Sequence, residues 1–549
     1  MGERAMVWCS TRAGGLGAVC AAALAVAALP APAAARPVVA WAAPALARVL
    51  PTDPAPAGAG AAAGTARLAA ARGETESFQI VVRAAGGEPL GEVSVGVTEL
   101  TGPGGAVIRA ADVALFREHY VEVRRGSPAS PAGGEAGAAG LYPDALVPFV
   151  DPATGRAPAS GAKYKAQPFA VEAGRNQPVW VDVAVPRSLP PGTYRGGWWA
   201  RSAQGGAGGQ VELTVWRATL PETPTLRSSF NQWNDHSLAA DRVLVDHKVM
   251  PLWTDPAGAR KLAAKGALNA SKGALNASGL GFWSGAEADG ECRVGRPPSA
   301  AQIVQRAAAF PRGPLLYNLT ADGVDDDCPA AAIGPLQQWA EALHAAGVAN
   351  LVVGAPDPRL LADAGQGRPA VDIWAVGPAG YHAATERVRA AAAGGAEIWG
   401  TTTLGGDGAG SPAWLLDRPP IAYRLLPGYV SQSLGLKGLL YWAADYWPAD
   451  PWTDVEYRTR DGQAWPGEGL LVYPGAPAGA TGVVPSIRLK HVRDGVEDYD
   501  LLLLARAAGL PGLAKELEAV GGRDWRGWAT DPDALEASRR RIGEALDRR

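Results

Sequence analysis

Residues 371–402, VDIWAVGPAGYHAATERVRAAAAGGAEIWGTT, begin and end with a short apolar run and hold a helical stretch between them. The runs at 371–376 and 397–402 have the length and composition of buried strands, and 381–393 predicts the helix that joins them. A strand, a helix and a second strand in this order are typical of a parallel sheet covered by helices. This unit therefore indicates an α/β fold for its part of the chain.

The same alternation continues on both sides of this unit. A helical stretch lies at 333–346, and further strand-like runs lie at 227–233, 315–319, 350–355 and 438–443. Because the pattern extends over residues 225–510, it favours a (β/α)8 TIM-like barrel over a doubly wound sheet. No glycine-rich phosphate loop follows a first strand, which argues against a nucleotide-binding fold.

Before residue 220 the pattern is that of an antiparallel β-sandwich, which we assign to residues 65–220. Short alternating runs with Gly/Pro turns between them predict strands at 76–83, 93–97, 179–183, 194–200 and 210–216. Residues 126–166 interrupt this pattern, and we expect a long loop that wraps the sandwich or reaches the barrel. Residues 221–224 (PETP) predict a stiff linker, and residues 511–549 predict C-terminal helices.

The N-terminus predicts export. A positive region with Arg4 and Arg12 precedes an apolar run at 15–29, and small-residue cleavage sites follow it, so residues 1–35 are interpreted as a signal peptide. Residues 36–64 are a Pro/Ala-rich leader. We expect a secreted protein, or one on the cell-envelope exterior, with no membrane span after cleavage. Cys292 and Cys328 would then be the remaining cysteines, either as a disulfide or as two partly buried thiols.

The composition indicates which classes of ligand this protein is expected to bind. The formal net charge is −3 with no basic face, which argues against nucleic acid, and the oligomeric state is left open. The six His show no metal-ligand spacing, and no cofactor is expected. The chain has 19 Trp but only 7 Phe, and a flat ring with a polar N–H suits half-exposed platforms as well as cores.

Function in such a barrel lies where the strands end, and acids and aromatic rings recur there. This combination suits a carbohydrate, since rings stack on sugar faces and carboxylates bind hydroxyls and catalyse transfer. The loop at 322–327 can instead be a solvated acidic loop or a weak cation site. The candidate catalytic residues are Asp322, Asp325 and Asp326, and the candidate substrate-binding residues are Tyr381, Trp399, Trp414, Asp417, Tyr441, Trp442, Tyr446 and Trp447.

Residues 486–500, SIRLKHVRDGVEDYD, closely resemble the late signature of glycoside hydrolase family 123. Upstream stretches agree in order: ESFQ at 76–79, PGTYRG at 191–196, VDIW at 371–374, LDRP at 416–419, LYW at 440–442 and GLLVYPG at 469–475. The resemblance implies a β-sandwich followed by a barrel. It also implies a retaining β-N-acetylgalactosaminidase that acts on a hexosamine-containing glycan.

In the mechanism that the resemblance implies, the 2-acetamido oxygen of the substrate attacks the anomeric carbon. An Asp orients the acetamido group, and an adjacent Glu is the general acid/base. Alignment of Tyr317 places Asp322 on the family Asp but Gly323 on the family Glu. Glycine cannot transfer a proton, so Asp325 or Asp326 supplies the acid, the chemistry differs, or activity is lost. A carbohydrate-binding barrel without catalysis and a structural cell-surface protein are therefore the alternatives to a glycosidase.

The charged residues of the late signature have a structural interpretation. They lie near the start of a predicted helix, where paired charges organise a junction more often than they touch substrate. We therefore expect Arg488, Arg493, Glu497 and Asp498 to support the fold and not the reaction.

Overall fold

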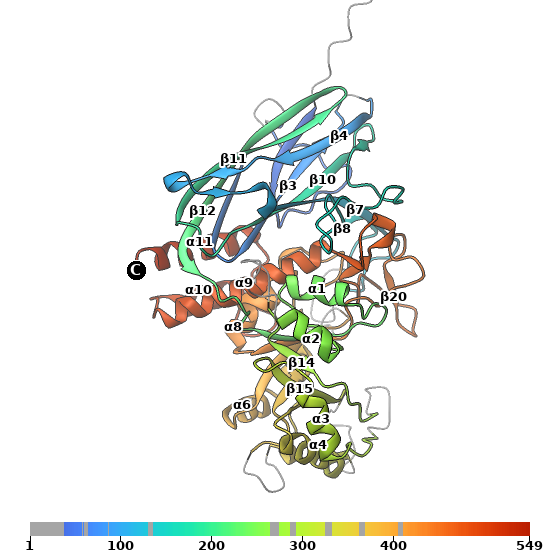
Figure 1. Ribbon diagram of the computed structural model, residues 1–549, viewed down its shortest axis with the longest axis vertical. Coiled ribbons are helices and arrows are strands. Elements are labelled where there is room, and N and C mark those ends of the chain that lie inside the picture. The colour runs from blue at the N-terminus through green and yellow to red at the C-terminus, as the bar shows by residue number, and fades with distance from the viewer. Residues whose placement is uncertain are drawn as a thin grey trace, which may run out of the picture. The chain divides into compact units, whose positions relative to one another are not determined.

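The computed structural model describes residues 38–549 apart from 58, 60–63, 86, 130–135, 264–273, 286–292, 324–331, 362–367 and 405–409. Its N-terminal part is a sandwich of two sheets (Figure 1). The first sheet is antiparallel and has the order β1 (Val39–Pro44), β3 (Thr75–Arg83), β10 (Asn176–Ala184), β7 (Val113–Val123), β8 (Gly140–Pro148). The second has the order β2 (Thr65–Arg72), β12 (Gly205–Thr219), β11 (Gly192–Ser202), β4 (Leu90–Val97), β9 (Phe169–Val171), with β5 (Leu100–Thr101) and β6 (Val107–Ile108) beside it.

Alternating apolar residues hold the two sheets together. Phe78, Ile80 and Val82 of β3 face the same core as Trp198 of β11 and Leu213 of β12. A strand with only one covered face would leave the residues between them exposed. Here β3 is buried on both faces from Thr75 to Val82, because α9 (Ile487–Ala507) covers the outer face at Thr75 and Ser77 and residues between Trp41 and Val49 cover it at Gln79 and Val81.

Two expectations for this region are corrected. Residues 39–44, predicted as part of a leader, form β1 and pair with β3, and Ala40, Trp41 and Ala43 are buried there. The stretch 126–166 is not wholly a loop, since it contains β8, which pairs with β7. The remainder does reach the other half: the backbone N–H of Ala159 donates to the carbonyl of Gly479 (2.8 Å).

The C-terminal half is built on a parallel, nearly closed sheet. Seven strands have the order β13 (Arg227–Phe230), β19 (Gly438–Tyr441), β18 (Glu397–Thr401), β17 (Ile373–Val376), β16 (Ala349–Val353), β15 (Leu315–Ala321), β14 (Ala277–Gly279). Between the two end strands lies an extended segment at Pro251. The N–H of Phe230 donates to Met250, and the N–H of Leu252 donates back to Phe230. A Cβ on Gly279 would lie 2.7 Å from the Leu252 carbonyl, so this segment also lies against β14.

Helices follow the strands in chain order. They are α1 (Leu238–Asp246), α2 (Pro256–Ala263), α3 (Ala300–Ala308), α4 (Ile333–Ala345), α5 (Pro378–Ala383), α6 (Thr385–Ala393), α7 (Ile421–Leu425), α8 (Ser431–Leu434), α9 (Ile487–Ala507), α10 (Leu513–Gly521) and α11 (Pro532–Asp547). Two small hairpins, β20 (Glu456–Arg458) with β21 (Ala464–Pro466) and β22 (Val472–Pro474) with β23 (Val483–Pro485), lie between β19 and α9. Among the described helices, none is long and apolar enough to span a membrane.

Helix α9 carries the late signature and joins the two halves. Arg488 donates to Asp144 of β8 through Nε (3.0 Å) and Nη2 (2.9 Å). Arg493 forms an ion pair with Asp182 of β10 (3.1 Å), and the backbone N–H of Thr75 donates to Glu497 (3.2 Å). Asp498 accepts from Arg424 and Arg539, which lie on other helices. All four signature residues are buried in these contacts, as their structural interpretation requires.

Candidate active site

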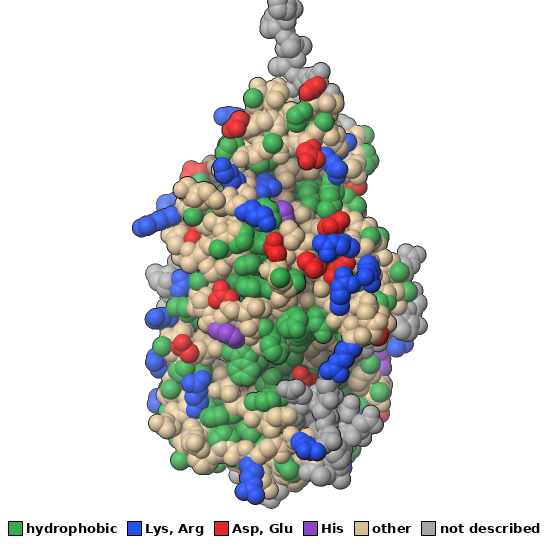
Figure 2. Space-filling model, turned by 90° about the vertical axis from the view of Figure 1, so that its right-hand side faces the viewer, with side chains coloured by type: hydrophobic (Ala, Val, Ile, Leu, Met, Phe, Trp, Pro, Cys, Tyr) green, Lys and Arg blue, Asp and Glu red, His purple; other side chains and the backbone are tan. Residues whose placement is uncertain are grey.

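The carboxyl ends of the parallel strands lie at one edge of the sheet, which we call the mouth. Aromatic side chains are exposed there, in the segments after β13, β14 and β19: Trp233 (55% exposed), Trp283 (40%) and Tyr446 (44%). Figure 2 views the side on which β20 lies in Figure 1 and shows hydrophobic side chains gathered across the middle of that face. Exposed rings at a strand-end edge are suited to stacking on a flat ligand.

Four of the rings after β13 and β19 form an aromatic cluster: Trp233, Trp442, Tyr446 and Tyr457. The ring of Tyr446 lies 5.9 Å from Trp233, 5.3 Å from Trp442 and 5.8 Å from Tyr457. Tyr457 belongs to β20, so the small hairpin closes one side of the cluster. Tilted and edge-to-face pairs at such separations are favourable, and they fix the exposed rings in place.

Glu468 lies beneath this cluster. One carboxylate oxygen, Oε1, accepts from Trp442 Nε1 (2.6 Å) and from the Tyr441 hydroxyl (3.4 Å), and Oε2 accepts from the backbone N–H of Leu404 (2.9 Å). These partners connect Glu468 to the ends of both β18 and β19. The next residue, Gly469, has a φ of +70°, and a Cβ there would lie 2.6 Å from the ring of Trp442. Glycine therefore lets the chain press Glu468 against the indole.

Burial dominates the electrostatics of this carboxyl. Glu468 is 4% exposed, and burial raises its pKa to about 7, although hydrogen bonds from Trp442 and Leu404 act in the opposite direction. A cavity of about 310 Å³ lies beside it, lined by Tyr446, Trp447, Pro448, Val455, Glu456, Tyr457, Arg458, Glu468 and Leu470. A buried carboxyl that is half protonated near neutral pH can act as an acid or a base.

Two other carboxylates near the mouth accept hydrogen bonds that hold loops in place. Asp445 accepts from the backbone N–H groups of Trp233 (2.6 Å), Asn234 (3.1 Å) and Asp235 (2.8 Å), so it fixes the loop that carries the exposed Trp233. Burial raises the pKa of Asp445 despite these donors. Asp417 accepts from the N–H (2.6 Å) and hydroxyl (3.0 Å) of Ser127 and ties the sandwich to the segment after β18.

Comparison with known proteins agrees with this architecture. The family model for the glycoside hydrolase 123 N-terminal domain matches residues 55–198, and the model for the glycoside hydrolase 123 catalytic domain matches residues 401–505. The chain is a glycoside hydrolase family 123-like protein. The match to the catalytic-domain model supports a glycoside hydrolase function.

One solved structure has a similar fold over most of the chain. A family 123 glycoside hydrolase from Clostridium perfringens, described with glycolipid glycan hydrolysis, covers 93% of this chain and 98% of its own at 12% identity and a TM-score of 0.60. A β-glucuronidase from Parabacteroides merdae covers 74% of this chain and 51% of its own, at 7% identity and a TM-score of 0.27. No curated protein matches.

In the family 123-like protein, Asp322 follows β15 directly and is half-buried, and the next residue, Gly323, has a φ of +73°. The strand itself is fixed across the sheet interior, because the Tyr317 hydroxyl donates to Ser229 of β13 (2.7 Å). Asp322 therefore lies at the mouth. Asp325 and Asp326 lie outside the described residues, and so do Cys292 and Cys328.

The aromatic candidates divide into two groups. Trp442 and Tyr446 belong to the aromatic cluster, and half-buried Trp447 lines the cavity and donates to the carbonyl of Val472 (2.8 Å). Trp399, Trp414 and Tyr441, also candidate substrate-binding residues, are buried and do not belong to the exposed rings of the mouth. Trp399 packs on Tyr317 at 5.7 Å, Trp414 packs between Phe230 and Tyr441, and Tyr441 reaches the site only through its hydroxyl.

Tyr381 and Asp417 lie apart from this group. Tyr381, in α5, is half-buried with its ring 6.1 Å from Trp525 of the C-terminal segment, and Asp417 is engaged by Ser127. Sequence reasoning missed Trp233, Trp283, Tyr457 and Glu468. A signal for Glu468 was present, because glycines at 467 and 469 mark a tight turn just before the motif at 469–475.

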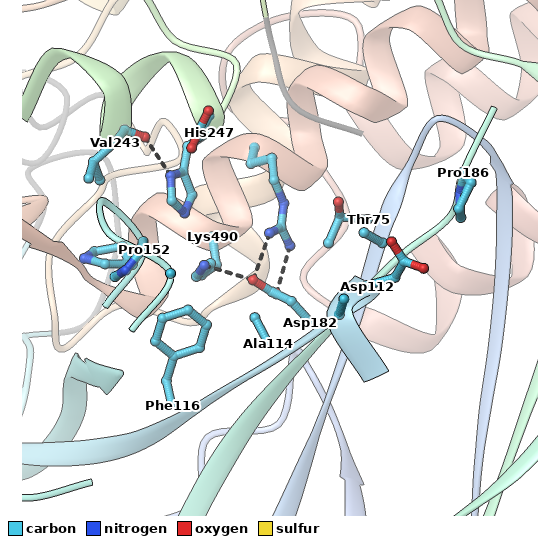
Figure 3. Close-up of a pocket in the computed structure, with 16 residues that line it drawn as sticks. Thr75, Asp112, Ala114, Phe116, Pro152, Asp182, Pro186, Val243, His247 and Lys490 are labelled. Atoms are coloured by element: carbon cyan, nitrogen blue, oxygen red, sulfur yellow. Dashed lines mark hydrogen bonds and ion pairs between the residues drawn. The ribbon is translucent and has the colours of Figure 1, made fainter. Parts of the chain in front are cut away.

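A second cavity, of about 380 Å³, lies where the first sandwich sheet meets α1 and α9 (Figure 3). Lys490 and Arg493 both point to Asp182 there, at 2.7 and 3.1 Å. Burial opposes ionisation of Asp182, but the two cations outweigh it and hold the pKa of Asp182 below its usual value. Arg493 also pairs with Asp494 (2.7 Å), so two acids face two cations, and the cavity belongs to the junction and not to the mouth. Within the described part of the chain, no cluster of three metal-ligating side chains occurs.

Proposed function

We propose that this protein is an exported glycoside hydrolase that binds a hexosamine-containing glycan at the mouth and cleaves it as a retaining, substrate-assisted β-N-acetylhexosaminidase. The nearly closed sheet then acts as a (β/α)8 barrel, in which catalytic groups come from the ends of several strands. The observation that carries the proposal is the set of exposed rings beside buried carboxyls at that edge. The catalytic-domain match gives the reaction class.

The chemistry divides between substrate and protein. In substrate-assisted hydrolysis the acetamido oxygen attacks C1, so the protein needs a carboxylate that orients the acetamido group and a second group that moves a proton. We assign the first role to Asp322, because it follows β15 at the mouth and occupies the position that the resemblance gives to the orienting Asp. Trp233, Trp283 and Tyr446 provide the platform for the sugar rings.

The test is hydrolysis of chromogenic β-glycosides, including N-acetylgalactosaminide and N-acetylglucosaminide. Wild type should turn over an acetamido sugar but not the matched 2-hydroxy sugar, and Asp322→Asn should lose most of that activity. Asp533→Asn changes a carboxyl in the first turn of α11, away from the mouth, and is the matched control. Turnover of the 2-hydroxy sugar at the same rate would rule out acetamido assistance.

A second function has one observation in its favour. Gly323 occupies the position at which the resemblance places the acid. A glycine there agrees with a protein that binds glycans but does not cleave them. Glycan binding by calorimetry without turnover of any glycoside in the panel would establish this alternative. Export is tested separately: secreted protein should begin near residue 36 when its N-terminus is sequenced.

A further inference from the structure

The proposed function leaves the source of the proton open, and the inference below rests on that function. Cleavage of a glycosidic bond to an ordinary alcohol needs a protonated acid beside the leaving oxygen. Among the described mouth carboxyls, Asp445 is held by three backbone N–H groups and Asp417 by Ser127. Each of these two carboxylates holds a loop in place through backbone or hydroxyl donors.

Glu468 differs from both in its surroundings. Its described donors are an indole and a hydroxyl from the end of β19 and one backbone N–H from the segment after β18, and none of these described partners is a cation. A carboxyl without a paired cation in a buried site keeps its proton more readily. The same residue lines the cavity that Tyr446, Trp447 and Tyr457 surround. A sugar stacked on these rings would thus lie beside a carboxyl.

We propose that Glu468 is the proton donor for glycosidic bond cleavage in this protein. Its proton passes to the glycosidic oxygen while the C1–O bond breaks and the acetamido oxygen bonds to C1, so the aglycone leaves as a neutral alcohol. The Glu468 carboxylate then takes a proton from a water molecule whose oxygen attacks C1. This step opens the ring formed by the acetamido group and restores both the acid and the acetamide.

The hydrogen bonds of Glu468 indicate which of its oxygens carries the proton. Trp442 fixes Oε1, and Leu404 is the only described donor to Oε2, so Oε2 keeps a site for the proton. Burial already brings the pKa of Glu468 to about 7, the range in which one group can donate and then accept a proton. The proton donor thus comes from the segment after β19. The segment after β15 has Gly323 beside Asp322, and glycine cannot donate a proton.

The decisive variant is Glu468→Gln, assayed on two acetamido glycosides of one sugar. With a 4-methoxyphenyl or alkyl aglycone, which leaves poorly, we expect a loss of about 10²–10³-fold in kcat/KM, which reports cleavage of the C1–O bond. With a 2,4-dinitrophenyl aglycone, which needs no protonation, the first step should be nearly unaffected. Glu118→Gln is the matched control, because Glu118 is also buried with a pKa raised by burial but lies on β7 of the sandwich.

A second variant keeps the proposal testable even if Glu468→Gln folds poorly. Trp442→Phe removes a donor that stabilises the carboxylate, so the pKa of Glu468 should rise. The alkaline limb of the kcat/KM profile should therefore move to higher pH, whatever happens to the absolute rate. A limb that stays in place would refute the assignment of that limb to Glu468.

The outcomes separate the two proposals. Absence of wild-type turnover contradicts the proposed function itself. Wild-type turnover with an equal loss of kcat/KM for both aglycones in Glu468→Gln makes Glu468 a structural residue, and the function stands. The aglycone-dependent loss appearing instead in Asp325→Asn or Asp326→Asn assigns the proton to the 322–327 loop and overturns the inference. A loss confined to the poor leaving group in Glu468→Gln supports it.

Discussion

Replacement of Arg488 by Met should strongly destabilise the protein. The guanidinium of Arg488 donates twice to Asp144 of the sandwich and also to the carbonyls of Trp414 (2.9 Å) and Gly467 (2.6 Å). Both members of the pair are buried. Met fills similar space but leaves the Asp144 carboxylate with the Tyr473 hydroxyl (2.5 Å) as its remaining described partner.

The magnitude follows from that geometry. Removal of one partner of a buried ion pair costs about 3–5 kcal/mol, because the other charge stays in a low-dielectric site. If Asp144 is also changed to Asn, the stranded charge disappears. The double variant should therefore recover about 1–3 kcal/mol relative to the sum of the two single changes.

Urea denaturation of wild type, both single variants and the double variant measures these terms, with Arg548→Met as an exposed control that should change stability by less than about 0.5 kcal/mol. A loss below about 1 kcal/mol for Arg488→Met would refute the claim that this residue holds the sandwich on the barrel.

Three further predictions concern the mouth. Gly469→Ala should cost about 1–3 kcal/mol and lower activity, because its Cβ would meet the indole of Trp442, and thermal unfolding checks this. Burial raises the folded-state pKa of Glu468 above the usual 4.5 to about 7, so its contribution to stability is present below pH 4.5 and is lost as pH rises through 7. Glu468→Gln should therefore gain about 3 kcal/mol relative to wild type between pH 4.5 and pH 8, and parallel urea midpoints would contradict this. Trp233 is exposed, so Trp233→Ala should raise KM for an oligosaccharide with little change in Tm. Trp399 is buried, so Trp399→Ala should lower the free energy of unfolding by about 3–5 kcal/mol. A large loss of stability for Trp233→Ala and a raised KM alone for Trp399→Ala would contradict these roles.

The regular elements followed from local patterns. The unit at 371–402 forms β17, α5 with α6, and β18, because apolar runs of that length bury best in a parallel sheet between helices. Short pieces were not predictable in the same way. The strand β14 has only three residues, Ala277–Gly279, and the segment at Pro251 pairs through a few backbone bonds, so neither has a periodicity to detect.

The site was only partly predictable, for a physical reason. Sequence position shows that Trp399 and Trp442 both lie near a strand end, but whether a ring faces the interior or solvent depends on strand register. Trp399 points inward and packs on Tyr317, whereas Trp442 follows the end of β19 and joins the aromatic cluster. Glu468 was missed because its contacts with Trp442 and Leu404 bring together residues far apart in the chain.

Helix α9 has a consequence for how this protein can be divided. Every residue from Ile487 to Leu502 is buried, although one side of the helix faces the sandwich and another faces the barrel. A piece cut after residue 224 would present Lys490, Arg493 and Glu497 to water on a helix with no solvent-facing side, and its removal would strip Asp182 of its cations. The sandwich is thus not a separable accessory domain, because it covers one side of the C-terminal half. Neither half should fold as a stable, soluble fragment when it is expressed alone.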